Sequence, residues 1–116
     1  MSLTYAPQLS SVSTSGKAVQ VHNTATPGTT FHTAVSGSAA FDEVIVWAYN
    51  GHTGDVTLTL ELGGTTAPNV VVQNLAAKTG LQLILPGNRF NGAVVLAAFA
   101  SVADVVALYV NINHVA

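Results

Sequence analysis

Charged side chains are scarce in this sequence of 116 residues: only 7% are Asp, Glu, Lys or Arg. Soluble domains usually carry about 25% charged residues, which keep their surfaces apart. The cations are Lys17, Lys78 and Arg89, and the carboxylates are Asp42, Glu43, Asp55, Glu61 and Asp104. Three scattered cations form no basic patch, so we expect no nucleic-acid partner. A β-rich surface with so little charge favours association with other subunits.

Cysteine is absent, which excludes disulfides and thiolate metal sites. The first seven residues lack the basic start and the apolar run of a signal peptide. The longest apolar stretches, 93–100 and 105–110, are far shorter than the roughly 20 residues of a membrane helix. We therefore expect a protein made in a reducing cytoplasm, with no membrane partner.

Apolar residues make up 49% of the chain and fall in short runs broken by Gly, Pro, Asn and Ser. This spacing predicts an all-β fold over residues 17–116, an antiparallel β-sandwich or jelly roll of about eight strands in one domain. Residues 1–16 are rich in Ser and Thr and predict an extended N-terminal arm. Two interpretations of the arm stay open: a frayed terminus, or a segment that becomes ordered on a neighbouring subunit.

The run from Phe41 to Tyr49 is apolar on both sides, which predicts a central strand covered on both faces. Alternation over 55–62 predicts a half-buried strand that forms a hairpin with it. We expect a second hairpin between 70–75 and 81–85, with Leu81, Leu83 and Leu85 on a core face. The last expected pair joins 93–100 to 105–112.

The residues that could carry chemistry are dispersed. His22, His32, His52 and His114 lie in four different elements, without the close spacing of a metal site, although His22 and His32 could meet across a first hairpin. Asp42 and Glu43 are neighbours on a strand and point to opposite faces, so we expect Asp42 to cap the preceding turn and Glu43 to pair with a cation. Neither a nucleophile elbow nor a phosphate-binding glycine motif is present. The sequence therefore predicts no enzyme, and no catalytic, cofactor or metal residues.

Aromatic residues and the sole arginine are the candidates for a subunit contact. Arg89 lies beside Phe90 in an expected loop over 86–92, and an arginine next to an aromatic ring is typical of interface anchors. The possible interface residues are Tyr5, Leu9, Trp47, Tyr49, Arg89, Phe90 and Tyr109. An alternative from another class is a glycan-binding module with Trp47 or Tyr49 exposed, although Trp47 fits core packing better.

From about residue 41 to the C-terminus the chain resembles small virion proteins of tailed bacteriophages. The likeness rests on the sequences VTLTLELGGTT at 56–66, GL at 80–81, LPG at 85–87, NG at 91–92, AAFA at 97–100 and YVNIN at 109–113. The resemblance implies a non-enzymatic capsid decoration (cement) protein that binds the major capsid protein or other virion subunits. It also implies a homo-oligomer, with a trimer favoured, located on the phage head. A neck, tail or fibre component is the alternative within this class.

Overall fold

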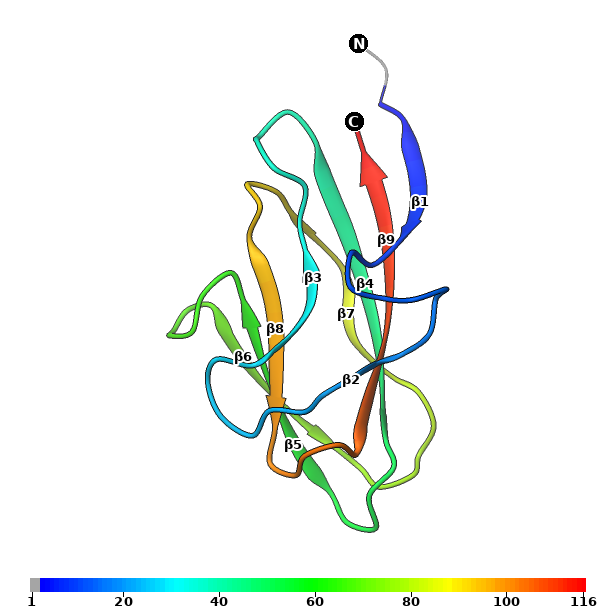
Figure 1. Cartoon of the computed structure of the whole chain (residues 1–116), viewed down its shortest axis with the longest axis vertical. Helices are drawn as coiled ribbons and strands as arrows, with labels where there is room; N and C mark the ends of the chain where they lie inside the picture. Colours follow the sequence, from blue (N-terminus) through cyan, green and yellow to red (C-terminus); the bar gives the residue numbers. More distant parts are fainter. Residues whose placement is uncertain (1–2) are drawn as a thin grey trace.

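The computed structural model describes residues 3–116, which form nine β-strands and no helix (Figure 1). No helix that could cross a membrane is therefore found in this part of the chain. The strands are β1 (Tyr5–Leu9), β2 (Val19–Gln20), β3 (Thr29–Thr33), β4 (Phe41–Asn50), β5 (Val56–Leu62), β6 (Val70–Leu75), β7 (Gln82–Phe90), β8 (Val95–Ala100) and β9 (Val106–Val115).

The strands form two antiparallel sheets that face each other across one core. One sheet has the order β1-β9-β4-β7, with the short β2 also paired to β9, and the other has the order β3-β8-β5-β6. The predicted all-β sandwich is thus confirmed. Two of the strands, β1 and β2, lie in parts of the chain where the alternation of apolar and polar residues is weak.

The predicted hairpins are wrong. Strand β4 pairs with β7 and β9, whereas β5 lies in the other sheet, paired with β6 and β8. The chain likewise changes sheet between β6 and β7 and between β8 and β9. Among the nine described strands, β5 and β6 are the one consecutive pair joined as a hairpin. An apolar alternation fixes which side of a strand faces the core but not which strand lies beside it.

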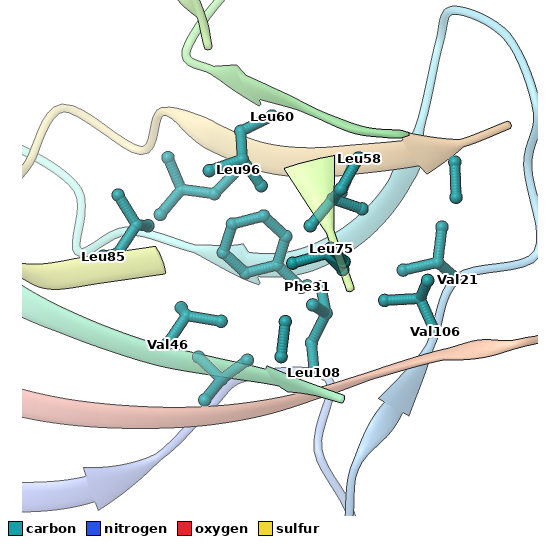
Figure 2. Packing of buried hydrophobic residues seen from close by; sticks show 14 of the residues in the cluster. Val21, Phe31, Val46, Leu58, Leu60, Leu75, Leu85, Leu96, Val106 and Leu108 are labelled. Carbon is teal, nitrogen blue, oxygen red and sulfur yellow. The ribbon is translucent and has the colours of Figure 1, made fainter. Parts of the chain in front are cut away.

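The core lies between the inner faces of the two sheets. In β4 every second residue from Asp42 to Asn50 is buried, including Val44, Val46 and Ala48. Figure 2 shows the ring of Phe31 at the centre, between Leu96 of β8 and Val46 of β4. The prediction of a central strand is confirmed for β4, but its second face is only half-buried.

Residues 5–9 of the predicted N-terminal arm form a strand and residues 11–16 are mostly turns, so an extended arm over residues 1–16 stays a prediction. Strand β1 pairs along β9, with Tyr5 opposite Val115 and Leu9 opposite Asn111. The hydroxyl of Ser10 donates to the carbonyl of Phe31, and Ser10 is buried. A frayed terminus does not describe residues 5–10, while contact with a neighbouring subunit stays a prediction. Positions 1 and 2 of the predicted arm lie outside the described residues.

A buried asparagine holds the crossing from β4 to β5. The side-chain amide of Asn50 donates to the carbonyls of Gly54 at 3.1 Å and Leu75 at 3.0 Å. Its carbonyl oxygen accepts the backbone N–H of His52 at 2.9 Å. Asn50 is fully buried, so its side chain provides the hydrogen bonds that water would otherwise make to the backbone of the β4–β5 loop. The bond to Leu75 also joins this loop to the end of β6.

Replacing Asn50 with Ala should lower the free energy of unfolding by about 2–3 kcal/mol, because it leaves a buried carbonyl without its donor. Denaturant unfolding followed by circular dichroism measures the change. The matched control is Asn74→Ala on the exposed side of β6, which should cost less than about 0.5 kcal/mol. Equal effects of the two variants would contradict this role for Asn50.

Candidate functional site

The outward side of the five-stranded sheet carries several large apolar residues, with Glu43, Arg89, Asn111 and Asn113 among them. Residues directly opposite each other on antiparallel strands share a face, so the strand register places them. Trp47 of β4 lies between Tyr109 of β9 and Leu83 of β7. Tyr109 and Leu83 are 40% and 46% exposed, and Trp47 is half-buried between them.

The same register places further apolar residues along the sheet. Ile45 is opposite Asn111, which is opposite Leu9 of β1. Phe41 is opposite Val115, which is opposite Tyr5. We call this surface the apolar outer face, and it comprises Tyr5, Leu9, Phe41, Ile45, Trp47, Tyr49, Leu83 and Tyr109.

Six of the seven predicted interface residues lie on this side of the sheet: Tyr5, Leu9, Trp47, Tyr49, Arg89 and Tyr109. The seventh, Phe90, is opposite Asp42 and packs against the core. The sequence places Phe90 next to Arg89, and neighbours on a strand point to opposite sides. The structure therefore brings the six together on one face, and their role as an interface stays a prediction.

Strand β7 departs from the sequence pattern because it contains two register shifts. Leu85 is opposite Val46 and Leu83 is opposite Trp47, which leaves Ile84 as an extra residue. This β-bulge reverses the alternation, so Leu85 is buried while Leu81 and Leu83 are exposed. The predicted core face of three leucines is therefore wrong, and two of them are on the surface.

The second shift makes Arg89 part of a strand instead of the expected loop. Gly87 has a φ of 119° and is the extra residue between Pro86 and Asn88. Pro86 lacks an N–H, which an edge strand such as β7 tolerates. Arg89 then lies opposite Glu43, with its Nε 3.0 Å from Oε2.

The predicted pairing of Glu43 with a cation is confirmed by this contact. The guanidinium of Arg89 also lies 5.1 Å from the centroid of the Phe41 ring. At that distance the arginine is attracted to the ring as well as to the carboxylate. Glu43 and Arg89, the two charged residues that the register puts on this side of the sheet, thus pair with each other.

A polar cluster that sequence reasoning missed lies at the other side of β4. Asp42 is buried, with a 2.9 Å contact from Oδ2 to His32 Nε2 and a 2.9 Å contact from Oδ1 to His114 Nδ1. The backbone N–H of Val35 also donates to Oδ2 at 3.1 Å. Asp42 therefore joins β3, β4 and β9, and its backbone partner is Val35. The expected cap of the turn at residues 38–40 stays a prediction.

The histidines thus meet in a combination that their spacing did not suggest. His22 lies in the loop after β2 and pairs with Asp104, whereas His32 pairs with Asp42, so the expected meeting of His22 and His32 is not found. The His32–Asp42–His114 cluster could be predicted only if the pairing of β4 with β9 were known. Among residues 3–116, no three His, Asp or Glu side chains are arranged to hold a metal ion.

The cluster fastens the N-terminal segment and does not activate a hydroxyl group. Nδ1 of His32 accepts the backbone N–H of Ser11 at 3.1 Å, so the nitrogen that could act as a base is occupied. The Ser11 hydroxyl instead accepts the N–H of Thr33 at 3.0 Å. Burial raises the pKa of Asp42, but hydrogen bonds from His32, His114 and Val35 outweigh it and hold the pKa below its ordinary value.

Comparisons with protein-family models, with curated proteins and with solved structures find no match to this chain. The resemblance to phage virion proteins therefore stays a prediction.

Replacing Asp42 with Asn should lower the free energy of unfolding at neutral pH by about 3 kcal/mol, because it breaks a buried charged cluster. Since the pKa of Asp42 is lowered by folding, the carboxylate stabilises the native state above about pH 5 and loses this effect as the pH falls through its folded-state pKa.

Denaturant unfolding between pH 7 and pH 3 measures this dependence. The wild-type protein should lose stability toward pH 3, and Asp42→Asn should lose less over the same range. The control variant Asp55→Asn removes an exposed carboxylate and should retain the wild-type slope. A wild-type slope in Asp42→Asn would show that other groups cause the acid sensitivity.

Proposed function

We propose that this protein is a non-enzymatic structural subunit that self-associates through the apolar outer face. The observation that supports this proposal most is the composition of that face: eight large apolar residues, with Asn111 and Asn113 beside them and two charged residues that pair with each other. Contiguous exposed apolar surface on a charge-poor protein marks an association site more often than scattered apolar residues do.

The size of the face fits a subunit contact. The four strands β1, β9, β4 and β7 have 5, 10, 10 and 9 residues. At about 4.8 Å between strands and about 3.3 Å per residue, they give a surface of roughly 540 Å². Two copies would then bury about 1,100 Å², which is above the roughly 1,000 Å² expected of a biological interface. Tyr109, Trp47 and Tyr49 would supply aromatic anchors, and the Arg89–Glu43 pair would lie beside them.

Within this class, we propose a capsid decoration (cement) protein of a tailed bacteriophage, on the basis of the sequence resemblance described above. It would be made in the host cytoplasm and would bind the major capsid protein as a symmetric oligomer, with a trimer favoured. The small β-sandwich, the absence of cysteine and the scarcity of charge agree with this assignment. A neck, tail or fibre subunit would use the same surface.

A glycan-binding module would need an exposed aromatic platform. Trp47 and Tyr49 are half-buried on the outer face, and Trp47 is flanked by Leu83 and Tyr109. Such packing favours a subunit contact over a sugar platform, because a platform presents the full face of its ring. Sugar binding that protects Trp47 from acrylamide quenching would favour the glycan module instead.

Leu83→Glu should weaken self-association about tenfold or more, because an unpaired carboxylate would be buried at the contact. Analytical ultracentrifugation over a range of micromolar concentrations measures it. Val72→Glu, at a 64% exposed position on the other sheet, is the matched control and should associate like the wild type. A wild-type protein that is a stable monomer at these concentrations would contradict the proposal.

The location in the particle is tested separately, on purified virions whose genome encodes this sequence. Quantitative mass spectrometry should find the protein in many copies per head, and stripped heads should bind the added purified protein again. A few copies per particle would favour the neck or tail assignment. Absence from purified particles would contradict a virion role altogether.

A further inference from the structure

Glu61 is a buried carboxylate on the outward side of the four-stranded sheet. It is 3% exposed and lies in β5 between Ala97 of β8 and Val70 of β6. One oxygen accepts the backbone N–H of Gly28 at 2.6 Å, and the other accepts the hydroxyl of Thr26. Both donors belong to the loop between β2 and β3, which runs beside β8 (Figure 1).

The loop lies close to the sheet, which directs the backbone N–H of Gly28 toward Glu61. A Cβ atom at Gly28 would lie 2.5 Å from the backbone of Ala98, so only glycine fits there. This close approach explains how the carboxylate becomes buried on a face that usually meets water.

Glu61 differs from the other acidic residues of the described chain in its partners. Asp42, Glu43 and Asp104 each contact a basic side chain, and Asp55 is exposed. Glu61 is buried, yet the donors that reach it, Thr26 and Gly28, are neutral. Buried charges in proteins are usually paired with an opposite charge, and two neutral donors leave part of the acceptor capacity of a carboxylate free.

A surface pocket of about 310 Å³ opens beside this carboxylate. Its walls include Glu61 and Thr30, the apolar side chains of Pro27, Val95 and Ala97, and the turn at Gly63 and Gly64. The lining of this pocket therefore combines apolar side chains and glycines with two threonines, Thr30 and Thr65, and one acidic residue, Glu61. The pocket lies on the sheet opposite the apolar outer face, so it is independent of the contact proposed above.

We propose that this pocket binds the side chain of a lysine from another polypeptide, with the ammonium group at Glu61. The apolar walls would contact the four methylene groups of the lysine, and the carboxylate would supply the missing opposite charge. An arginine fits less well, because its guanidinium favours a carboxylate with both oxygens free, whereas each oxygen of Glu61 already accepts a bond. Calcium and magnesium need about six oxygen ligands, which these apolar walls do not offer.

The test uses the full-length protein and Nα-acetyl-lysine methylamide as the probe. In two-dimensional ¹⁵N NMR, titration of this probe should shift the amide signals of Gly28, Gly63 and Gly64 in a saturable way. Nα-acetyl-norleucine methylamide, which has a neutral side chain of similar shape, should bind at least about tenfold more weakly. The arginine analogue and calcium chloride should also bind more weakly.

Glu61→Gln is the matched variant, because a glutamine can accept the Gly28 N–H through its oxygen and donate to Thr26 through its amide. It should keep the fold and lose the preference for lysine over norleucine. Asp55→Asn, which removes an exposed carboxylate outside the pocket lining, should bind the lysine probe like the wild type. The comparison of the two ligands on the wild-type protein tests the pocket even if Glu61→Gln does not fold.

Equal binding of lysine and norleucine probes, or no saturable shift at these glycines, would overturn the proposal. Neither result depends on self-association, which Leu83→Glu tests on the opposite sheet. A lysine-dependent shift in a protein that is monomeric would support the pocket and contradict the outer-face contact. The two proposals can therefore fail separately.

Discussion

The packing of β4 and β9 against the four-stranded sheet is the constraint on which the other features depend. These two ten-residue strands are neighbours over their whole length, and their inward residues form one side of the core. Burial of alternate residues fixes the orientation of each strand, and thereby sends Trp47 and Tyr109 outward and Asp42 inward. The apolar outer face and the His32–Asp42–His114 cluster both follow from this one pairing.

The chain crosses between the sheets at nearly every connection, and polar residues hold these crossings. Asn50 fastens the crossing after β4, and Glu61 fastens the loop that leads to β3. Asp42 joins three strands near the end of the sandwich and holds the N-terminal segment through His32. The few buried charged and amide side chains thus form hydrogen bonds with backbone N–H and C=O groups in the turns, which the apolar core cannot do.

The sequence was sufficient for the fold class because period-2 alternation is a local property. Val56, Leu58 and Leu60 are buried as their spacing predicts. Strand pairing was not predictable from the same pattern, because two apolar faces can meet within a hairpin or across a sandwich. Leu83 shows a further limit: its exposure depends on one extra residue in the register with β4, which no alternation reveals.

The candidate surface was predictable in part for the same reason. Trp47, Tyr49 and Tyr109 follow from alternation, whereas the inclusion of Tyr5 and Leu9 required β1 to be placed on β9. The cluster around Asp42 could not be predicted, because residues 32, 42 and 114 come together only through the sheet order. Long-range polar contacts leave no periodic signal in a single sequence.

The positions of the charged residues show that few of them are free on the surface. Asp42 and Glu61 are buried and Glu43 pairs with Arg89, so the surface carries even less free charge than the composition indicates. The edges of the five-stranded sheet are also poor templates for pairing, since β1 contains Pro7 and β7 contains Pro86 and two bulges. The proposed self-association would therefore use the face of that sheet, where Trp47 and Tyr109 lie, because its edges obstruct strand addition.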